Sequence, residues 1–143
     1  MGFMRTINEI IVHCTATPEG KDFKAKDIDR WHRERGWKKI GYHYVIDLDG
    51  TIEKGRGENE VGAHCNGRNA HSIGVVYVGG LAKDGKTPKD TRTEAQKEAL
   101  WKLLISLIIK YPDATIHGHN EFSSKACPCF SVKEEYKDIN LKK

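Results

Sequence analysis

The sequence predicts a single α/β domain in which a central mixed β-sheet is flanked by helices. Segments rich in β-branched residues alternate with segments of helical periodicity, and one Asp-Gly pair indicates a β-hairpin within this alternation. The chain has 143 residues, a length that fits one domain and leaves little room for a second. We therefore expect residues 1–143 to form one domain.

The N-terminal part is predicted to form a strand, a loop and a helix. Residues 7–14 (INEIIVHC) are nearly continuous in apolar character, as in a strand that is buried on both faces. Residues 15–24 contain proline and glycine, which is typical of a loop. The next segment is expected to be a helix that Asp27 caps and that stops at Gly36.

The middle of the chain is predicted to form a hairpin and a long loop. Residues 44–48 have strand character, and Asp49-Gly50 is a strong turn signal before a second short strand at residues 51–54. Residues 55–71 are rich in glycine, asparagine and histidine and show no periodicity. A loop of this length inside a compact domain is usually functional.

The C-terminal half repeats the alternation of strand and helix. Residues 73–78 (IGVVYV) indicate a buried strand, and residues 81–90 are polar and predict a turn. Thr93 and Gln96 form a capping-box pattern at the start of a helix that Tyr111-Pro112 ends. The apolar positions of this helix follow helical spacing: Leu100, Leu103, Leu104, Leu107 and Ile108.

Two further short elements complete the prediction. Residues 114–117 form a short strand candidate, and a final helix is expected from about Ser131 through Tyr136. Repeats, low-complexity tracts and internal linkers are absent from the sequence. The pattern therefore describes one continuous α/β unit.

Composition excludes several functional classes. With 38% hydrophobic residues the chain can form a core, and its longest apolar-dominated run, residues 99–108, is far too short to cross a bilayer. The formal net charge is +4, from 24 basic and 20 acidic residues. These charges are interspersed and form no basic block, so we expect a mild attraction to anionic partners, but neither a nucleic acid nor a membrane as partner.

The four cysteines could pair in three ways as two disulfides. However, the first ten residues lack the basic and apolar regions of a secretory signal, which predicts a cytoplasmic protein with reduced thiols. Reduced cysteines near histidines are typical of ligands or nucleophiles. We expect Cys14 to pack as a small apolar residue.

Three candidate ligands lie at or just beyond the ends of predicted strands. His13 ends the first strand, His119 follows the strand near residue 116, and Cys127 comes eight residues later. Side chains from distant segments converge where the strands of an α/β sheet end. Two neutral imidazoles and one thiolate are a typical zinc set that leaves the fourth position for water and keeps a Lewis-acidic charge on the ion.

The residues alone leave alternatives open. Cys127 and Cys129 could form a metal knuckle, although their spacing is one residue short of the usual pattern. A cysteine nucleophile with His119 or His64 as its base is a further alternative. His117 is the main rival ligand, because it would share a strand face with His119.

Five segments in a fixed order carry a family resemblance. They are IVHCTAT (residues 11–17), GYHY (41–44), GAH (62–64), SIGV (72–75) and KACP (125–128). Together they resemble the zinc-dependent N-acetylmuramoyl-L-alanine amidases of the phage T7 lysozyme type, which share a fold with peptidoglycan recognition proteins. The resemblance extends from about residue 8 to residue 136.

The resemblance implies a role for each matching residue. The zinc ligands would be His13, His119 and Cys127, and the catalytic residues would be Tyr42 and Lys125. His64 and Asn69 would bind substrate. The bond that is cut would join the lactyl group of N-acetylmuramic acid to L-alanine in peptidoglycan. An ammonium and a phenol beside zinc would stabilise the oxyanion of the tetrahedral intermediate.

The resemblance also implies a biological setting. We expect a monomeric phage or prophage endolysin that accumulates in the cytoplasm and is released to the cell wall by another factor, such as a holin. A non-catalytic peptidoglycan-binding module and an inhibitor of another protein are the alternatives. The sequence departs from many relatives at Cys129, where they have glycine, and this extra thiol could compete for the metal.

Overall fold

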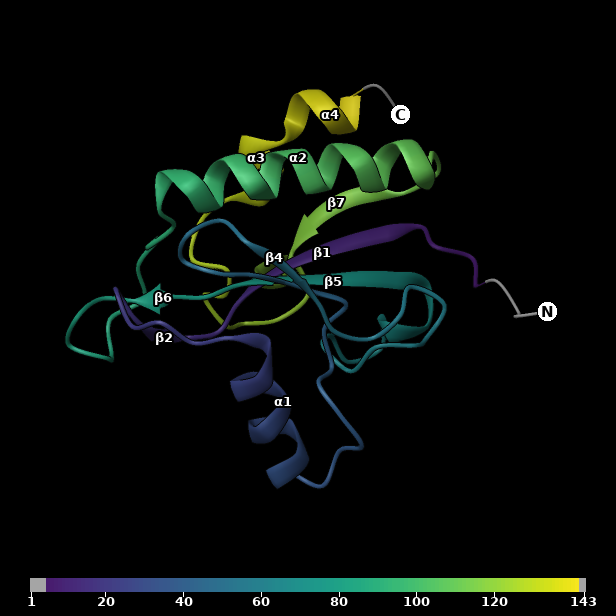
Figure 1. The fold of residues 1–143 in the computed structure, drawn as a ribbon. Coiled ribbons are helices and arrows are strands. Elements are labelled where there is room, and N and C mark those ends of the chain that lie inside the picture. Colours follow the sequence, from purple (N-terminus) through teal and green to yellow (C-terminus); the bar gives the residue numbers. More distant parts are fainter. Residues whose placement is uncertain (1–4, 142–143) are drawn as a thin grey trace.

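The computed structural model describes residues 5–141, which form the α/β domain that the sequence predicts. Within this span, a five-stranded sheet has the order β4-β3-β5-β1-β7 (Figure 1). Its strands are β1 (Glu9–Cys14), β3 (Tyr44–Ile46), β4 (Ile52–Lys54), β5 (Ser72–Tyr77) and β7 (Thr115–Gly118). A separate two-stranded sheet joins β2 (Thr17–Pro18) to β6 (Gly80–Leu81).

The sheet is mixed, as expected, and β1 lies in its interior. β1 runs parallel to both β5 and β7, and β3 runs parallel to β5, whereas β4 is antiparallel to β3. The register places Val12 opposite Gly118 and His13 opposite Val76. The carboxyl ends of β1 and β7 therefore lie at the same edge of the sheet. Two of the candidate ligands lie at this edge, because His13 is on β1 and His119 follows β7 directly.

Helices cover the two faces of the sheet. The long helix α2 (Glu94–Lys110) lies over one face together with α3 (Val132–Glu135) and α4 (Lys137–Leu141), and α1 (Ala25–Glu34) lies on the opposite side (Figure 1). Alternate residues of each strand point to opposite faces. The larger apolar core lies under α2 and includes Ile10, Val12, Ile73, Val75, Leu100, Leu104 and Ile116. Each fully buried aliphatic side chain of this kind stabilises the fold by about 1.5–3 kcal/mol.

The predicted caps and turns are confirmed, with one correction. Thr93 Oγ1 accepts a hydrogen bond from the N–H of Gln96, so the capping box forms at the start of α2. The hairpin forms through the N–H of Asp47 and the carbonyl of Thr51. The N-cap of the first helix is Lys24, three residues earlier than predicted, because the carboxylate of Asp27 accepts a hydrogen bond from the N–H of Lys24 (2.8 Å) instead of Asp27 occupying the cap itself.

Other boundaries differ locally from the prediction. The predicted final helix is confirmed as α3, with Ser131 as its N-cap and Tyr136 (φ −111°, ψ 20°) as its C-cap, and a further helix that was not predicted, α4, follows directly. The short strand β2 lies inside the loop predicted at residues 15–24, and β6 extends from Gly80 into the turn predicted at residues 81–90. Two-residue strands carry too little periodicity for a sequence pattern to reveal. No helix in residues 5–141 combines the length and apolar character needed to cross a membrane.

Candidate metal centre and active-site groove

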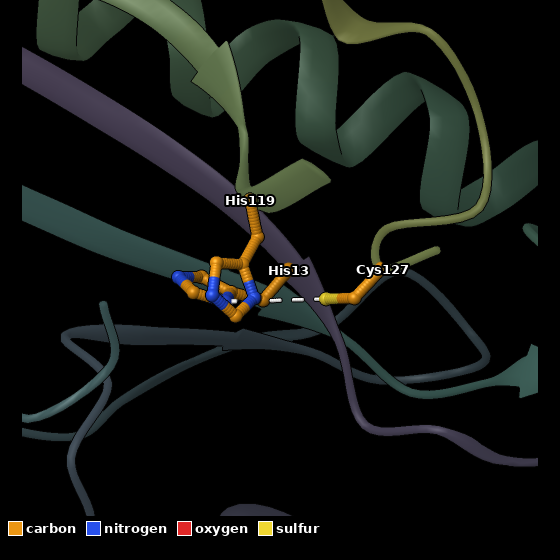
Figure 2. A group of neighbouring side chains, drawn as sticks. All are labelled: His13, His119 and Cys127. Carbon is orange, nitrogen blue, oxygen red and sulfur yellow. Dashed lines mark hydrogen bonds between the residues drawn. The ribbon is translucent and has the colours of Figure 1, made fainter. Parts of the chain in front are cut away.

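Three side chains from distant parts of the chain meet at the carboxyl edge of the sheet. His13 lies on β1, His119 begins the short 3-10 helix η2 (His119–Glu121) directly after β7, and Cys127 lies in the following loop (Figure 2). One ligand atom from each residue can be chosen so that all three lie within 4.8 Å of one another. The His13 Nδ1 and Cys127 Sγ atoms are 4.0 Å apart.

The protonation states of these three residues suit a metal ion. His13 is 1% exposed, and burial lowers its pKa well below the ordinary value, so its imidazole is neutral at pH 7. Burial, followed by the charge of Lys125, lowers the pKa of His119. A hydrogen bond with the Cys14 thiol lowers the pKa of Cys127, and the N–H of Cys14 also donates to its sulfur (3.2 Å). Neutral imidazoles and a thiolate are the donors that zinc prefers.

The rival ligand His117 has other partners. Its Nδ1 lies 2.9 Å from a carboxylate oxygen of Glu121, and its Nε2 lies 2.7 Å from the hydroxyl of Thr115. It is not part of the cluster that could hold a metal.

Two further histidines have structural roles. His32 accepts a hydrogen bond from the N–H of Gly41, and His43 accepts one from the N–H of Gly74.

A groove with a volume of about 540 Å³ opens beside the cluster. The sequence-predicted site residues that line it are Tyr42, His64, Asn69, His119 and Lys125. Arg35, Trp37 and Phe122 also lie on its walls, although the sequence patterns did not point to them. Their side chains come from the end of α1 and from loops, so only the folded chain brings them to the groove.

Tyr42 lies next to the candidate ligands. Its ring centroid is 5.1 Å from that of His13. Burial raises the pKa of Tyr42 well above its ordinary value, so the phenol keeps its proton and can donate a hydrogen bond at neutral pH. The preceding residue, Gly41, is required for this position, because a Cβ there would lie 2.1 Å from the carbonyl oxygen of Ala63.

Lys125 is exposed and lines the groove beside His119. It precedes Cys127 by two residues, so the loop that supplies the candidate sulfur ligand also carries the ammonium group. The N–H of Lys125 donates to the hydroxyl of Ser123 (3.2 Å). A phenol and an ammonium group thus stand beside the His–His–Cys cluster, which is a suitable arrangement for stabilising a developing negative charge.

The two predicted substrate-binding residues belong to one loop. Asn69 Oδ1 accepts hydrogen bonds from the N–H groups of His64 (2.9 Å) and Cys65 (3.0 Å). The His64 ring lies between two neighbours, because its Nδ1 is 2.9 Å from His13 Nε2 and its Nε2 is 3.1 Å from Ser72 Oγ. The sequence patterns did not indicate a role for Ser72 or the contact of His64 with His13, although all three residues lie in the five motifs.

The fold and the site together define an α/β protein with a candidate His–His–Cys metal centre beside a groove, an arrangement suited to hydrolysis. Residues 3–130 match the family model described as N-acetylmuramoyl-L-alanine amidase. The chain therefore belongs to the N-acetylmuramoyl-L-alanine amidase family, and it is an enzyme of this class.

Individual relatives agree with this assignment. The chain is 44% identical over 132 residues to the endolysin of Escherichia phage T7, covering 92% of this chain and 87% of that protein. Among solved structures, it is similar to the N-acetylmuramoyl-L-alanine amidase LysC from Clostridium intestinale (TM-score 0.79, 31% identity, 96% and 87% of the two chains). Drosophila PGRP-LB has a TM-score of 0.77 at 27% identity and covers 95% and 82%. The expected family and fold are confirmed.

Proposed function

We propose that this chain is a zinc-dependent endolysin that hydrolyses the amide bond between N-acetylmuramic acid and L-alanine in bacterial peptidoglycan. The observation that carries the proposal is the approach of His13, His119 and Cys127 at the edge of a groove. The family match and the phage endolysin relative support the same reaction. We further propose that residues 1–143 act as one amidase domain.

Zinc is the proposed metal because the donor set suits it. The three ligands would be the imidazoles of His13 and His119 and the thiolate of Cys127, and a structural zinc site would normally use four protein ligands. When bound there, zinc would supply a Lewis acid that polarises a carbonyl group and lowers the pKa of water toward about 7. A three-ligand set beside an open groove is typical of a catalytic site rather than a structural one.

Tyr42 and Lys125 are the proposed catalytic residues. The phenol of Tyr42 keeps its proton at neutral pH, so it would donate a hydrogen bond to the oxyanion that forms when water attacks the amide. The Lys125 ammonium group would stabilise the same charge from the groove side. Removing one donor of this kind typically lowers kcat by about 10²–10³-fold.

The groove is the proposed binding site for the stem peptide and its sugar. His64 and Asn69 are proposed to contact the substrate, because both line the wall next to the candidate ligands. Peptidoglycan is the proposed partner, and we propose that the enzyme is a monomer that accumulates in the cytoplasm before it reaches the wall. The mild positive charge of the chain would favour an anionic wall.

The test combines metal analysis with mass spectrometry of digested sacculi. We expect about one zinc ion per chain and fragments that carry a new L-alanine amino terminus and intact N-acetylmuramic acid. Zinc-loaded protein that binds sacculi in a pull-down but releases no fragment would contradict the proposal and favour a non-catalytic binding module. Cleavage at a glycosidic bond or inside the peptide would contradict the assigned bond.

A further inference from the structure

The His64 ring is placed between a candidate metal ligand and the sheet. Its Nδ1 lies 2.9 Å from Nε2 of His13, and the two rings meet edge to face with centroids 4.9 Å apart. On the other side, its Nε2 lies 3.1 Å from the Ser72 hydroxyl, at the first residue of β5. Both ring nitrogens of His64 therefore have partners within the protein.

The direction of these hydrogen bonds follows from the metal site. Nδ1 of His13 faces the sulfur of Cys127 and is the nitrogen available to a metal ion, so with that ion bound it would carry no hydrogen. The hydrogen of the neutral His13 ring is then on Nε2, and it is donated to Nδ1 of His64. Since His64 accepts at Nδ1, its own hydrogen is on Nε2 and is donated to Ser72 Oγ.

The chain leaves a slot for this ring. A Cβ added to Gly74 would lie 2.6 Å from His64 ring carbons, and one added to Gly62 would lie 2.7 Å from Cδ2 of the same ring. Both distances are too short for real side chains, so only glycine at these positions admits the ring. Asn69 completes the placement by accepting the N–H of His64. The GAH and SIGV segments therefore build one structure around His64.

We infer that His64 is a positioning residue for the metal centre: it accepts the Nε2 hydrogen of His13 and so holds that ligand in the ring orientation and tautomer that present Nδ1 to the metal. The Ser72 hydroxyl holds His64 on the other side of the ring, through its contact with Nε2. Metal-binding histidines commonly donate their second nitrogen in this way, and loss of the acceptor typically weakens metal affinity about 10–100-fold. This inference rests on the proposed zinc site and assigns His64 more than a substrate contact.

The experiment compares two substitutions at this position. In His64→Asn the amide oxygen stands near the place of Nδ1 and can still accept from His13, whereas His64→Leu cannot accept. We expect the zinc dissociation constant, measured by chelator competition, to rise about 10–100-fold in His64→Leu and to stay within about threefold of wild type in His64→Asn. Ser72→Ala should give a smaller rise in the same direction.

Two readouts separate positioning from other roles. His71→Leu is the matched control, because His71 is an exposed histidine of the same loop and should leave zinc affinity unchanged. Nitrogen-15 NMR of the zinc-loaded protein should show the hydrogen of His13 on Nε2 in wild type. If His64→Leu fails to fold, the comparison of His64→Asn and Ser72→Ala with wild type carries the test.

Wild-type zinc affinity in His64→Leu together with a raised KM would overturn the inference and leave a substrate-binding role. Equal weakening in His64→Asn and His64→Leu would overturn it as well, because the acceptor would then not matter. If the wild-type protein itself binds no zinc, the proposed function fails, which is a distinct outcome. If the wild type binds zinc tightly and all the variants match it, only the role of His64 is lost.

Discussion

The two faces of the central sheet bury different kinds of groups, although the same strands supply both. On β1, Val12 points into the apolar core under α2, whereas the next residue, His13, points to the face that carries the groove. The groove face also buries His43 and Asp47, beside a smaller apolar cluster of Ile28, Ile40, Val45, Val76 and Val78. Under α2 the buried side chain of Gln96 donates to two carbonyl groups, those of Ile46 in β3 and Val78 directly after β5.

This difference indicates that the α2 face serves mainly stability, whereas the groove face serves mainly the chemistry of the site. Packed aliphatic groups need only shape and volume, so the α2 face contributes mainly to the free energy of unfolding. Buried imidazoles and carboxyl groups need hydrogen-bond partners, so the groove face depends on specific neighbours. We therefore expect substitutions on the two faces to have separable effects, and the following predictions start with the largest.

The largest effect is expected for Cys127→Ser at the candidate metal site. Serine keeps the size of the side chain but is a poor zinc ligand at neutral pH, so tight zinc binding should be lost. Amidase turnover on sacculi should fall by at least about 10³-fold, which corresponds to about 4 kcal/mol. Metal analysis and an assay of released L-alanine amino termini would check this. Full activity in a variant without bound metal would contradict the role of Cys127 as a zinc ligand that activity requires.

The opposite result is expected for Leu104→Ala under α2. Leu104 is fully buried in the larger core, and removing its side chain should lower the free energy of unfolding by about 2–5 kcal/mol. Zinc affinity of the folded protein should stay within about twofold of wild type. Urea unfolding of the metal-free protein and chelator competition would measure the two quantities. A large loss of zinc affinity would show that the faces are coupled.

A pH-dependent effect is expected at Asp47. Burial, followed by the nearby carboxyl group of Glu53, raises the pKa of Asp47 to about 7. A carboxyl group with a raised pKa binds its proton more tightly in the folded state, so its stabilising contribution is present below about pH 4 and is lost as the pH rises through 7. Asp47→Asn resembles the protonated form and should add about 1–3 kcal/mol at pH 8 and close to none at pH 4. Thermal unfolding at both pH values would test this, and an equal gain at both would contradict it.

The smallest effect concerns backbone strain at Cys129. This residue has φ +73°, a conformation that glycine adopts without cost. Its thiol donates to the carbonyl of Gly80 and touches Cys14 on the α2 side. We expect Cys129→Gly to be about 1 kcal/mol more stable than Cys129→Ala, because both variants lose the thiol but only glycine relieves the strain. Urea unfolding of Cys129→Gly and Cys129→Ala would measure the difference in their free energies of unfolding. Equal free energies would exclude strain at this position.

Much of the fold follows from the sequence, because strong local patterns specify it. The continuous apolar run before His13, the Asp-Gly turn and the Thr93 capping box each predict an element that the structure contains. His119 was distinguishable from its neighbour His117 only through the family resemblance, because spacing alone places both near the same strand end. The structure separates them through the partners of His117.

The remaining features depend on distances that no local pattern contains. The contact between His13 on β1 and His64 in the loop before β5 joins residues 51 positions apart. The burial of Asp47 depends on packing at the start of α1, where Lys24 lies 3.6 Å from its carboxylate. The left-handed backbone at Cys129 follows from the loop that brings Cys127 to the cluster. Tertiary packing decides all three.

The position of β1 in the sheet has a consequence for how the enzyme is made. β1 is synthesised first, but its neighbour β7 begins at Thr115 and Cys127 comes later still. During translation β1 therefore lacks the pairing on one side that it has in the finished sheet, and non-local pairing of this kind is slow to form. The candidate ligand cluster can assemble only after Cys127 has left the ribosome. A chain that ends before Thr115 thus contains neither the complete five-stranded sheet nor the candidate metal site.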